Sequence, residues 1–216
     1  MSKILFCGYR EWALDLYTNL DFHGLHKGFD LARSPKELEF RTSKNKYDII
    51  FFIGWSWIIN EELLRSSRCI CMHPSPLPKY RGGSPLQNQI INGETEGAVT
   101  FFLIDEQIDH GNILWQRSLS LRDKLSSIFT DITTLTAQGI EFILSNPNYQ
   151  GYEQDHTQAT VCKRRKPADS EIKLEDFKNM TATQIYNKVR SLQNPYPNAF
   201  VVCKDNTILF LTEGHL

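Results

Sequence analysis

The sequence predicts an α/β protein built on a Rossmann-like mixed sheet, with a small helix and β-hairpin appended near its C-terminal end. Two apolar runs, at 48–53 and 69–73, have the length and character of buried strands. Helical patterns lie between such runs, which is typical of a sheet covered by helices. Two later apolar runs, at 199–203 and 207–211, flank Lys204-Asp-Asn, which is a hairpin signal.

The first elements expected are a strand over 3–8, ending at Gly8, and an amphipathic helix that reaches about Leu20. This β–loop–α start has one glycine where a dinucleotide-binding fingerprint has three, so it supports dinucleotide binding only weakly. Residues 21–47 are polar, and we expect them to be irregular, with a short helix beginning at 34–38.

The middle of the chain alternates short strands and helices. A short helix over 61–65 follows the strand at 48–53, and a proline-rich loop follows the strand at 69–73. The elements expected after that loop are a helix at 86–92, stopped by Gly93, and strands at 98–104 and 112–117.

The longest helical pattern runs from 126 to about 144 and is ended by Asn146-Pro147. The composition changes from Tyr149 onward. We therefore expect a Rossmann-like domain over 1–148 and a C-terminal extension over 149–216. The expected parts of the extension are a basic turn at 163–167, a helix at 181–192 and the hairpin.

The composition is that of a soluble globular protein, with 216 residues, 41% of them hydrophobic and 23% charged. The net charge of −1 gives no general attraction to nucleic acid or to anionic membranes. No apolar run approaches the ~20 residues of a membrane span. The N-terminus enters a strand without a signal-peptide layout. We expect a cytoplasmic protein with neither nucleic acid nor membrane as a partner.

Five cysteines, an odd number scattered along the chain, argue against a disulfide framework. Cys69, Cys71 and His73 alternate, so a strand would place all three on one face. Structural zinc sites usually pair cysteines from turns at C-x₂₋₄-C spacing, and no second Cys/His pair follows here. We expect buried thiols and no metal.

The most informative block of the sequence begins at His73. Three prolines follow it at alternate positions, then Lys79-Tyr-Arg-Gly-Gly-Ser-Pro85, and Asp109-His-Gly111 comes 24 residues later. Prolines lack an N–H and bias their predecessors toward extended geometry, so this segment is a rigid loop. His73 therefore sits where a central strand ends, at the edge of an α/β sheet where ligands bind.

This block resembles the folate-dependent formyltransferase family. The resemblance is carried by His73–Gly82, Pro85-Leu-Gln87, Asn92–Thr100 and Asp109-His-Gly111, and it extends from Lys3 to about Phe200. It implies the formyltransferase fold and an enzyme that moves a formyl group from 10-formyltetrahydrofolate, its co-substrate, to an amine, without a metal.

The resemblance also implies catalytic roles. His73 would stabilise the oxyanion and transfer a proton, and Asp109 would orient the imidazole and receive the amine proton through water. The family places an Asn where this chain has Cys71, and a thiol is a poorer donor than an amide. Three alternatives remain open. Cys71 acts as a weaker donor in the same role, Asn88 or a backbone N–H supplies the donor instead, or the transferase is slow. Cys71 as a nucleophile is the less favoured alternative, because a formyl thioester is not the family's route.

The family lines its folate pocket mainly with backbone, from the loop after one strand and from the segment ahead of D-x-G. The corresponding residues here are Trp57, Ile58 and Ile59, and Asp105, Gln107 and Ile108.

The amine acceptor is expected over the first β–α loop. Tyr9, Arg10 and Trp12 place a guanidinium and aromatic rings at a helix start, which suits phosphate or sugar. A solvated turn is the alternative for 163–166, and core packing is the alternative for Tyr196. The other residues expected to bind the acceptor are Lys79, Arg81, Lys163, Arg165 and Tyr196.

Three branches of the family compete. Methionyl-tRNA formyltransferases carry a further C-terminal domain for which we expect no room here, and glycinamide ribonucleotide transformylases usually show P-G at Arg81-Gly82. Nucleotide-sugar N-formyltransferases share the segment 84–89, the basic turn and Pro195-Tyr-Pro197. The resemblance is best there. It implies a dTDP-linked 4-amino-4,6-dideoxyglucose or a 3-amino isomer as acceptor, used in surface polysaccharide synthesis such as lipopolysaccharide O-antigen. A homodimer through the hairpin is expected on other grounds, because the runs at 200–203 and 208–211 are too hydrophobic for a lone exposed hairpin. The fused decarboxylase type ranks lower because it has an Arg where this chain has Gly83, and an inactive binding module is the alternative to an enzyme.

Overall fold

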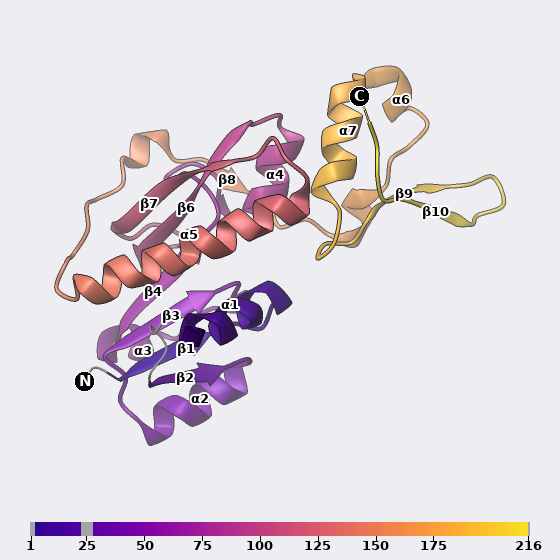
Figure 1. Ribbon diagram of the computed structural model, residues 1–216. Coiled ribbons are helices and arrows are strands. Elements are labelled where there is room, and N and C mark those ends of the chain that lie inside the picture. Colours follow the sequence, from indigo (N-terminus) through magenta and orange to yellow (C-terminus); the bar gives the residue numbers. More distant parts are fainter. Residues whose placement is uncertain (1–2, 23–27, 216) are drawn as a thin grey trace.

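The computed structural model describes residues 3–22 and 28–215, and its main part is the predicted mixed sheet, here with six strands (Figure 1). Four strands run parallel: β1 (Ile4–Cys7), β2 (Phe29–Ala32), β3 (Ile49–Ile53) and β4 (Arg68–His73). Two strands are antiparallel to their neighbours: β6 (Glu96–Leu103) and β7 (Ile113–Ser120). The strand order is β2-β1-β3-β4-β6-β7.

Helices cover both faces of this sheet. On one face lie α1 (Glu11–Phe22), α4 (Pro85–Ile91) and the long α5 (Leu125–Ser145), with the larger hydrophobic core beneath them (Figure 1). On the other face lie α2 (Pro35–Lys44) and α3 (Glu61–Ser66), over a smaller core. None of the helices within the described ranges is long and apolar enough to cross a bilayer.

The central strands explain why this sheet forms. All five residues of β3 are buried, as expected for a strand covered on both faces. Side chains of even and odd number enter opposite cores, because successive strand residues point to opposite faces. Phe51 thus enters the larger core, where its ring meets that of Phe101 edge-on at 6.3 Å, and Phe52 enters the smaller one.

One part of the sheet differs from the sequence-based expectation. Apart from a short helix start at 34–38, residues 21–47 were expected to be irregular, but residues 28–47 contain the edge strand β2 and the ten-residue helix α2. The part of that expectation at 23–27 lies outside the described residues. The helix begins where the pattern placed it, since the Ser34 hydroxyl accepts the Glu37 N–H at 3.2 Å and Pro35 occupies the first turn. The strand was missed because its four residues include Asp30 and give almost no alternating pattern.

The chain after α5 first returns along the sheet and then forms a C-terminal lobe. A short strand, β8 (Val161–Cys162), pairs in parallel with β5 (Arg81–Gly82), which lies in the loop after β4. The predicted hairpin is confirmed, and the lobe packs on the main part through α7 against α4 (Figure 1). The remaining elements are η1 (His156–Gln158), η2 (Pro167–Ser170), α6 (Asp176–Asn179), α7 (Ala182–Ser191), β9 (Ala199–Val202) and β10 (Ile208–Leu211).

Candidate active site

The candidate active site is built around His73, the last residue of β4, which is only 6% exposed. The strand alternation predicted from the sequence is present: Ile70 and Met72 enter the core under α5, whereas Cys69 and Cys71 lie on the opposite face. The strands β1 and β3 run parallel to β4 and end at the same edge of the sheet. The imidazole therefore lies at the carboxyl edge, the usual place for ligands in such sheets.

The proline-rich loop fixes the protonation pattern of the His73 ring. The loop turns back so that the Tyr80 carbonyl oxygen lies 2.8 Å from His73 Nε2. A carbonyl oxygen can only accept, so Nε2 carries a proton and donates it. In the neutral ring, Nδ1 then holds the free lone pair and is the atom that can take up a proton. The loop itself is held by the Ser75 hydroxyl, which donates to the Lys79 carbonyl at 2.9 Å.

Asp109 faces that nitrogen. Its Oδ2 lies 3.6 Å from His73 Nδ1, and its side chain is 16% exposed. The same oxygen accepts the Gly82 N–H at 2.7 Å, which anchors the carboxylate to the loop after β4. The separation from His73 is slightly beyond hydrogen-bond length, so the pair is poised to close when a proton reaches Nδ1. The predicted pair of His73 and Asp109 thus lies together.

The glycine of Asp109-His-Gly111 has a steric reason. Gly111 lies directly against β6, and a Cβ atom added there would collide with the carbonyl oxygen of Leu103. The loop stays in this close position because the Leu103 N–H donates to the Asn112 carbonyl at 2.9 Å. Asp109 itself has a left-handed backbone, with φ of 51°.

Cys71 lies close to Asp109, on the face of the sheet that carries the pair. Burial, together with the nearby Asp109 charge, raises the pKa of the Cys71 thiol well above its ordinary value. The neutral thiol is therefore the stable form, whereas a nucleophile or metal ligand must be a thiolate. Its nearest polar partner is the Met72 carbonyl, 3.6 Å from Sγ. These features favour a weak donor over a nucleophile.

Substitutions of Cys71 test this interpretation. Cys71→Asn introduces an amide donor beside the pair and is expected to preserve or increase turnover. Cys71→Ala is expected to cost little, because the weak S–H donor contributes far less than the ~2.7–4 kcal/mol of a good oxyanion donor. The measurement is the rate of formyl transfer before and after thiol alkylation. An inactive Cys71→Asn protein that still folds and binds folate would instead favour covalent catalysis.

The residues expected to line a folate pocket fall on two neighbouring segments. A cavity of about 390 Å³ lies between α3 and the loop after β6 and includes Asp105 and Gln107. Asp105 shapes this loop, since its Oδ1 accepts the Gln107 N–H at 2.9 Å and its Oδ2 lies 2.8 Å from His110 Nδ1. Ile108 is exposed. On the other segment, Ile59 packs against the smaller core just before α3, whereas Ile58 is fully exposed.

The first β–α loop gathers aromatic rings, as its sequence suggested. The Tyr9 ring lies 4.5 Å from that of Trp57, and the Arg10 guanidinium lies over it at 4.8 Å. Trp12 and Tyr196 both pack on the Phe129 ring of α5, at 5.8 Å each. Burial raises the pKa of Tyr196, and the nearby Arg10 charge opposes that rise. Trp12 and Tyr196 thus come together around Phe129 although they are far apart in sequence.

Arg81 does not face solvent, although its position in a loop suggested an exposed cation. Its side chain is 8% exposed, and its guanidinium bonds to Gln154 and to His156 rather than pointing into open space. Lys79, on the same loop, is exposed.

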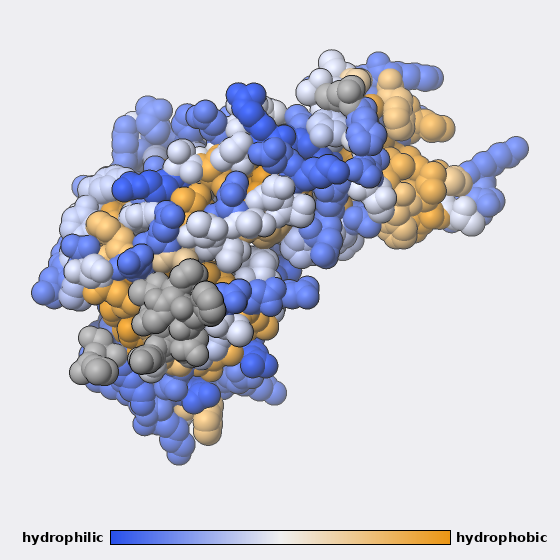
Figure 2. Space-filling model, in the orientation of Figure 1, coloured by the Kyte–Doolittle hydropathy of each residue, from blue (hydrophilic) through white to orange (hydrophobic). Residues whose placement is uncertain are grey.

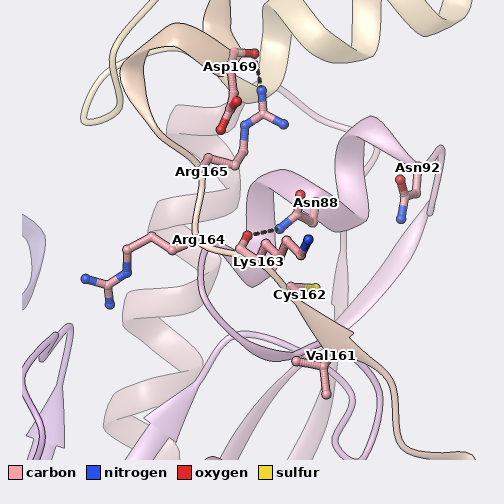
Figure 3. Close-up of a pocket in the computed structure, with 8 residues that line it drawn as sticks. All are labelled: Asn88, Asn92, Val161, Cys162, Lys163, Arg164, Arg165 and Asp169. Atoms are coloured by element: carbon pink, nitrogen blue, oxygen red, sulfur yellow. Dashed lines mark hydrogen bonds between the residues drawn. The ribbon is translucent and has the colours of Figure 1, made fainter.

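The basic turn borders a second cavity, of about 290 Å³, between β8 and α4 (Figure 3). Lys163 is exposed there, and its backbone carbonyl accepts the Asn88 amide at 3.3 Å. Arg165 is less free, because its guanidinium donates to the Asp169 carbonyl and its backbone N–H donates to the Ser84 hydroxyl at 3.1 Å. Figure 3 shows the Arg164 side chain pointing away from the others.

Sequence reasoning missed several residues that contact the pair or its neighbours. Gln154 and His156 lie in a polar segment without any periodic pattern, so nothing in the sequence marked them. His110 stands inside the D-x-G motif, and its ring stacks on that of His156 at 4.0 Å. Within the described ranges, no group of three or more His, Cys, Asp or Glu side chains is arranged to hold a metal ion.

Comparison with known families gives two matches. A family model described as formyl transferase matches residues 25–131, and a model of the formyl transferase C-terminal domain matches residues 166–214. The second match covers most of the C-terminal extension. The appended helix and hairpin are therefore shared with the family and do not by themselves separate its branches.

Individual relatives agree with these matches. A methionyl-tRNA formyltransferase of Nitratiruptor is 33% identical over 67% of this chain and 47% of its own length. The chain spans about half the length of the first curated relatives that it matches. A solved methionyl-tRNA formyltransferase from Clostridium thermocellum superposes with a TM-score of 0.82 at 27% identity, over 97% of both chains. A 4-N formyltransferase from Francisella tularensis shares the fold, with a TM-score of 0.75 at 20% identity, over 100% of this chain and 98% of that one.

Proposed function

Because this chain belongs to the formyl transferase family, we propose that it transfers a formyl group from 10-formyltetrahydrofolate to the amine of a nucleotide-linked aminosugar. The observation that carries the proposal is the arrangement of His73 and Asp109, a buried imidazole and a carboxylate 3.6 Å apart at the carboxyl edge of the sheet. No metal is needed for this chemistry.

The arrangement can serve each part of the reaction. The folate supplies the formyl group, and a bond forms between the acceptor nitrogen and the formyl carbon as the bond to the folate nitrogen breaks. The acceptor nitrogen loses one proton and the folate nitrogen gains one, so the transfer is balanced. His73 keeps one proton on Nε2, bound to the Tyr80 carbonyl, so Nδ1, which faces Asp109, is the nitrogen left to act on the reacting groups. A proton held on Nδ1 would stabilise the developing oxyanion. Asp109 would balance the imidazolium and receive the amine proton through water.

The nucleotide-sugar branch is supported by the residues around the pair. Lys163 is an exposed cation at the rim of the cavity between β8 and α4, and such a group suits a compact diphosphate. The aromatic ring of Tyr9, which packs on that of Trp57 from the expected folate side, could stack on a base or a sugar. We therefore propose a dTDP-linked 4-amino-4,6-dideoxyglucose or its 3-amino isomer as the acceptor, in a step toward a surface polysaccharide.

Methionyl-tRNA is the second candidate acceptor. It is favoured by the curated relatives, whose names give this substrate. The net charge of −1 argues against methionyl-tRNA as the acceptor, because a protein that binds tRNA usually has a basic surface.

A direct assay separates these candidates. The protein is incubated with 10-formyltetrahydrofolate and, in parallel, with the two dTDP-aminosugars, glycinamide ribonucleotide and charged methionyl-tRNA, and the formylated product is identified by mass. We expect transfer to a dTDP-aminosugar. Transfer to methionyl-tRNA alone would overturn the proposed acceptor, and binding without transfer to any of them would point to an inactive module.

The hairpin is proposed to form a homodimer interface. Four apolar side chains, Val202, Ile208, Leu209 and Phe210, are each about half exposed on β9 and β10, and Figure 2 shows the apolar surface over the C-terminal lobe. An isolated hairpin of this kind would be marginal in water. Light scattering is expected to give a dimer at micromolar concentration, and Phe210→Asp is expected to give a monomer that keeps its fold. A monomeric parent protein would contradict the proposal.

A further inference from the structure

Gln154 occupies an unusual position beside the candidate active site. The segment that carries it is fixed to β7, because the Tyr152 N–H and carbonyl both bond to Ile113, at 3.1 and 2.9 Å. Two residues later, the side chain of Gln154 turns inward and is only 3% exposed. This residue is outside every segment that the sequence marked for chemistry.

The amide of Gln154 connects two loops. Its Nε2 donates to the backbone carbonyls of Asp109 and Gly111, at 3.1 and 2.8 Å, so it holds both ends of the D-x-G motif. Its Oε1 accepts from the Arg81 guanidinium, at 2.6 Å from Nη2 and 3.2 Å from Nε. Each polar atom of the amide thus has two contacts, which is close to full use of its hydrogen-bonding capacity.

Arg81 completes a closed ring of contacts. On one side it is followed by Gly82, whose N–H binds the Asp109 carboxylate, and on the other it is preceded by Tyr80, whose carbonyl binds His73. The turn 80–82 therefore contacts both members of the pair directly. Gln154 ties this turn to the backbone of the second member, so neither loop can shift without breaking a buried hydrogen bond.

We propose that Gln154 is a positioning residue that sets the separation of Asp109 from His73 by clamping the D-x-G loop to the Arg81 turn. The inference rests on the proposed function, in which these two residues carry the chemistry. It also gives Arg81 a positioning role in place of the substrate contact expected from the sequence.

The geometry makes such a clamp necessary. Asp109 holds a left-handed backbone conformation, which persists only when the surroundings fix it. Its carboxylate stands at 3.6 Å from Nδ1, where a small displacement decides whether a protonated ring can bind it. A shift of about 1 Å in a catalytic group can cost roughly 100-fold in rate. Loss of the Gln154 amide would remove one hydrogen-bond donor from the carbonyls of Asp109 and Gly111 and one acceptor from the buried Arg81 guanidinium.

The test compares Gln154→Ala with Asn187→Ala. Asn187 is a matched control in α7, because it is also a buried amide whose oxygen accepts from a buried guanidinium, that of Arg190, at 2.8 Å, and it does not touch either loop. We expect Gln154→Ala to lower kcat at least about tenfold while KM for both substrates stays within about threefold. Asn187→Ala is expected to lower the melting temperature and leave kcat unchanged.

A readout that does not depend on activity accompanies the kinetics. Long-range ¹H–¹⁵N correlations of the His73 ring report its tautomer and hydrogen bonds, and they are expected to change in Gln154→Ala but not in Asn187→Ala. Gln154→Glu serves where the alanine variant folds poorly, because it keeps an acceptor for Arg81 but loses both donors to the carbonyls. It is expected to lower kcat in the same way.

Two results would overturn the inference. The first is an unchanged His73 spectrum and kcat in both folded Gln154 variants, and the second is an equal loss of kcat in Asn187→Ala, which would make the effect one of general stability. A His73→Ala protein with full turnover would refute the proposed function instead. In that case the His73 spectrum would still show whether Gln154 positions the ring.

Discussion

Turnover is expected to fall at least about 100-fold when His73 is replaced by alanine, and by a similar factor when Asp109 is replaced by asparagine. The first change removes the imidazole, whose Nδ1 would hold a proton beside the developing oxyanion. The second leaves the shape of the site almost unchanged, because an asparagine oxygen can still accept the Gly82 N–H. It removes only the negative charge that faces Nδ1.

This difference between the two variants makes the measurement informative. Asp109→Asn should retain the melting temperature and the affinity for folate, so that its loss appears in kcat rather than in KM. Asp131→Asn, an exposed carboxylate on α5, is the matched control and should behave like the parent. Full turnover by either active-site variant would refute the assignment of the pair.

The affinity for a nucleotide-sugar is expected to depend on the basic turn. Lys163→Ala should raise KM for the nucleotide-sugar ~10- to 150-fold, because a charge-assisted contact to a diphosphate contributes about 1.5–3 kcal/mol. The KM for formylfolate should not change, since its candidate pocket lies beside α3. Arg165→Ala should also lower the stability of the protein, because the Arg165 guanidinium donates a hydrogen bond to the Asp169 carbonyl.

Lys178→Ala is the control for this prediction, since Lys178 is an exposed cation on α6, away from the cavity. Initial rates are measured at varied nucleotide-sugar and fixed, saturating formylfolate. If single alanine variants of all four basic residues, 163–166, bind the sugar as the parent does, the turn is a solvated surface and the diphosphate binds elsewhere.

Much of the fold was predictable because its signals are local. A short stretch of sequence is enough to predict three of the elements. Buried apolar runs predict the strands β3 and β4, and a long periodic pattern predicts the helix α5. The strand pair of β5 and β8 was not predictable. Its members are two residues long and separated by 78 residues, and their pairing is decided by packing rather than by pattern.

The same distinction applies to the site. The pair of His73 and Asp109 was predicted because the motifs around both residues resemble those of a known family. The orientation of Arg81 could not be predicted, because a basic residue in a loop is expected to be exposed unless its buried partner is known. That partner, Gln154, follows 73 residues later in a segment without periodicity, and only the folded chain brings the two together.

The parallel pair of strands β5 and β8 fixes the distance between the basic turn and the pair of His73 and Asp109. Gly82, which holds Asp109, lies opposite Cys162, and Lys163 is the next residue along the chain. Successive strand residues advance by about 3.3 Å, so the lysine is held at a set offset from the imidazole. For an acceptor whose phosphates rest on Lys163, the reach from phosphate to amine must match the distance between the lysine ammonium group and the site beside the imidazole. Molecules of similar chemistry but different reach would bind at the turn and leave their amine out of line with the formyl carbon, so the two strands would select acceptors by dimension as well as by charge.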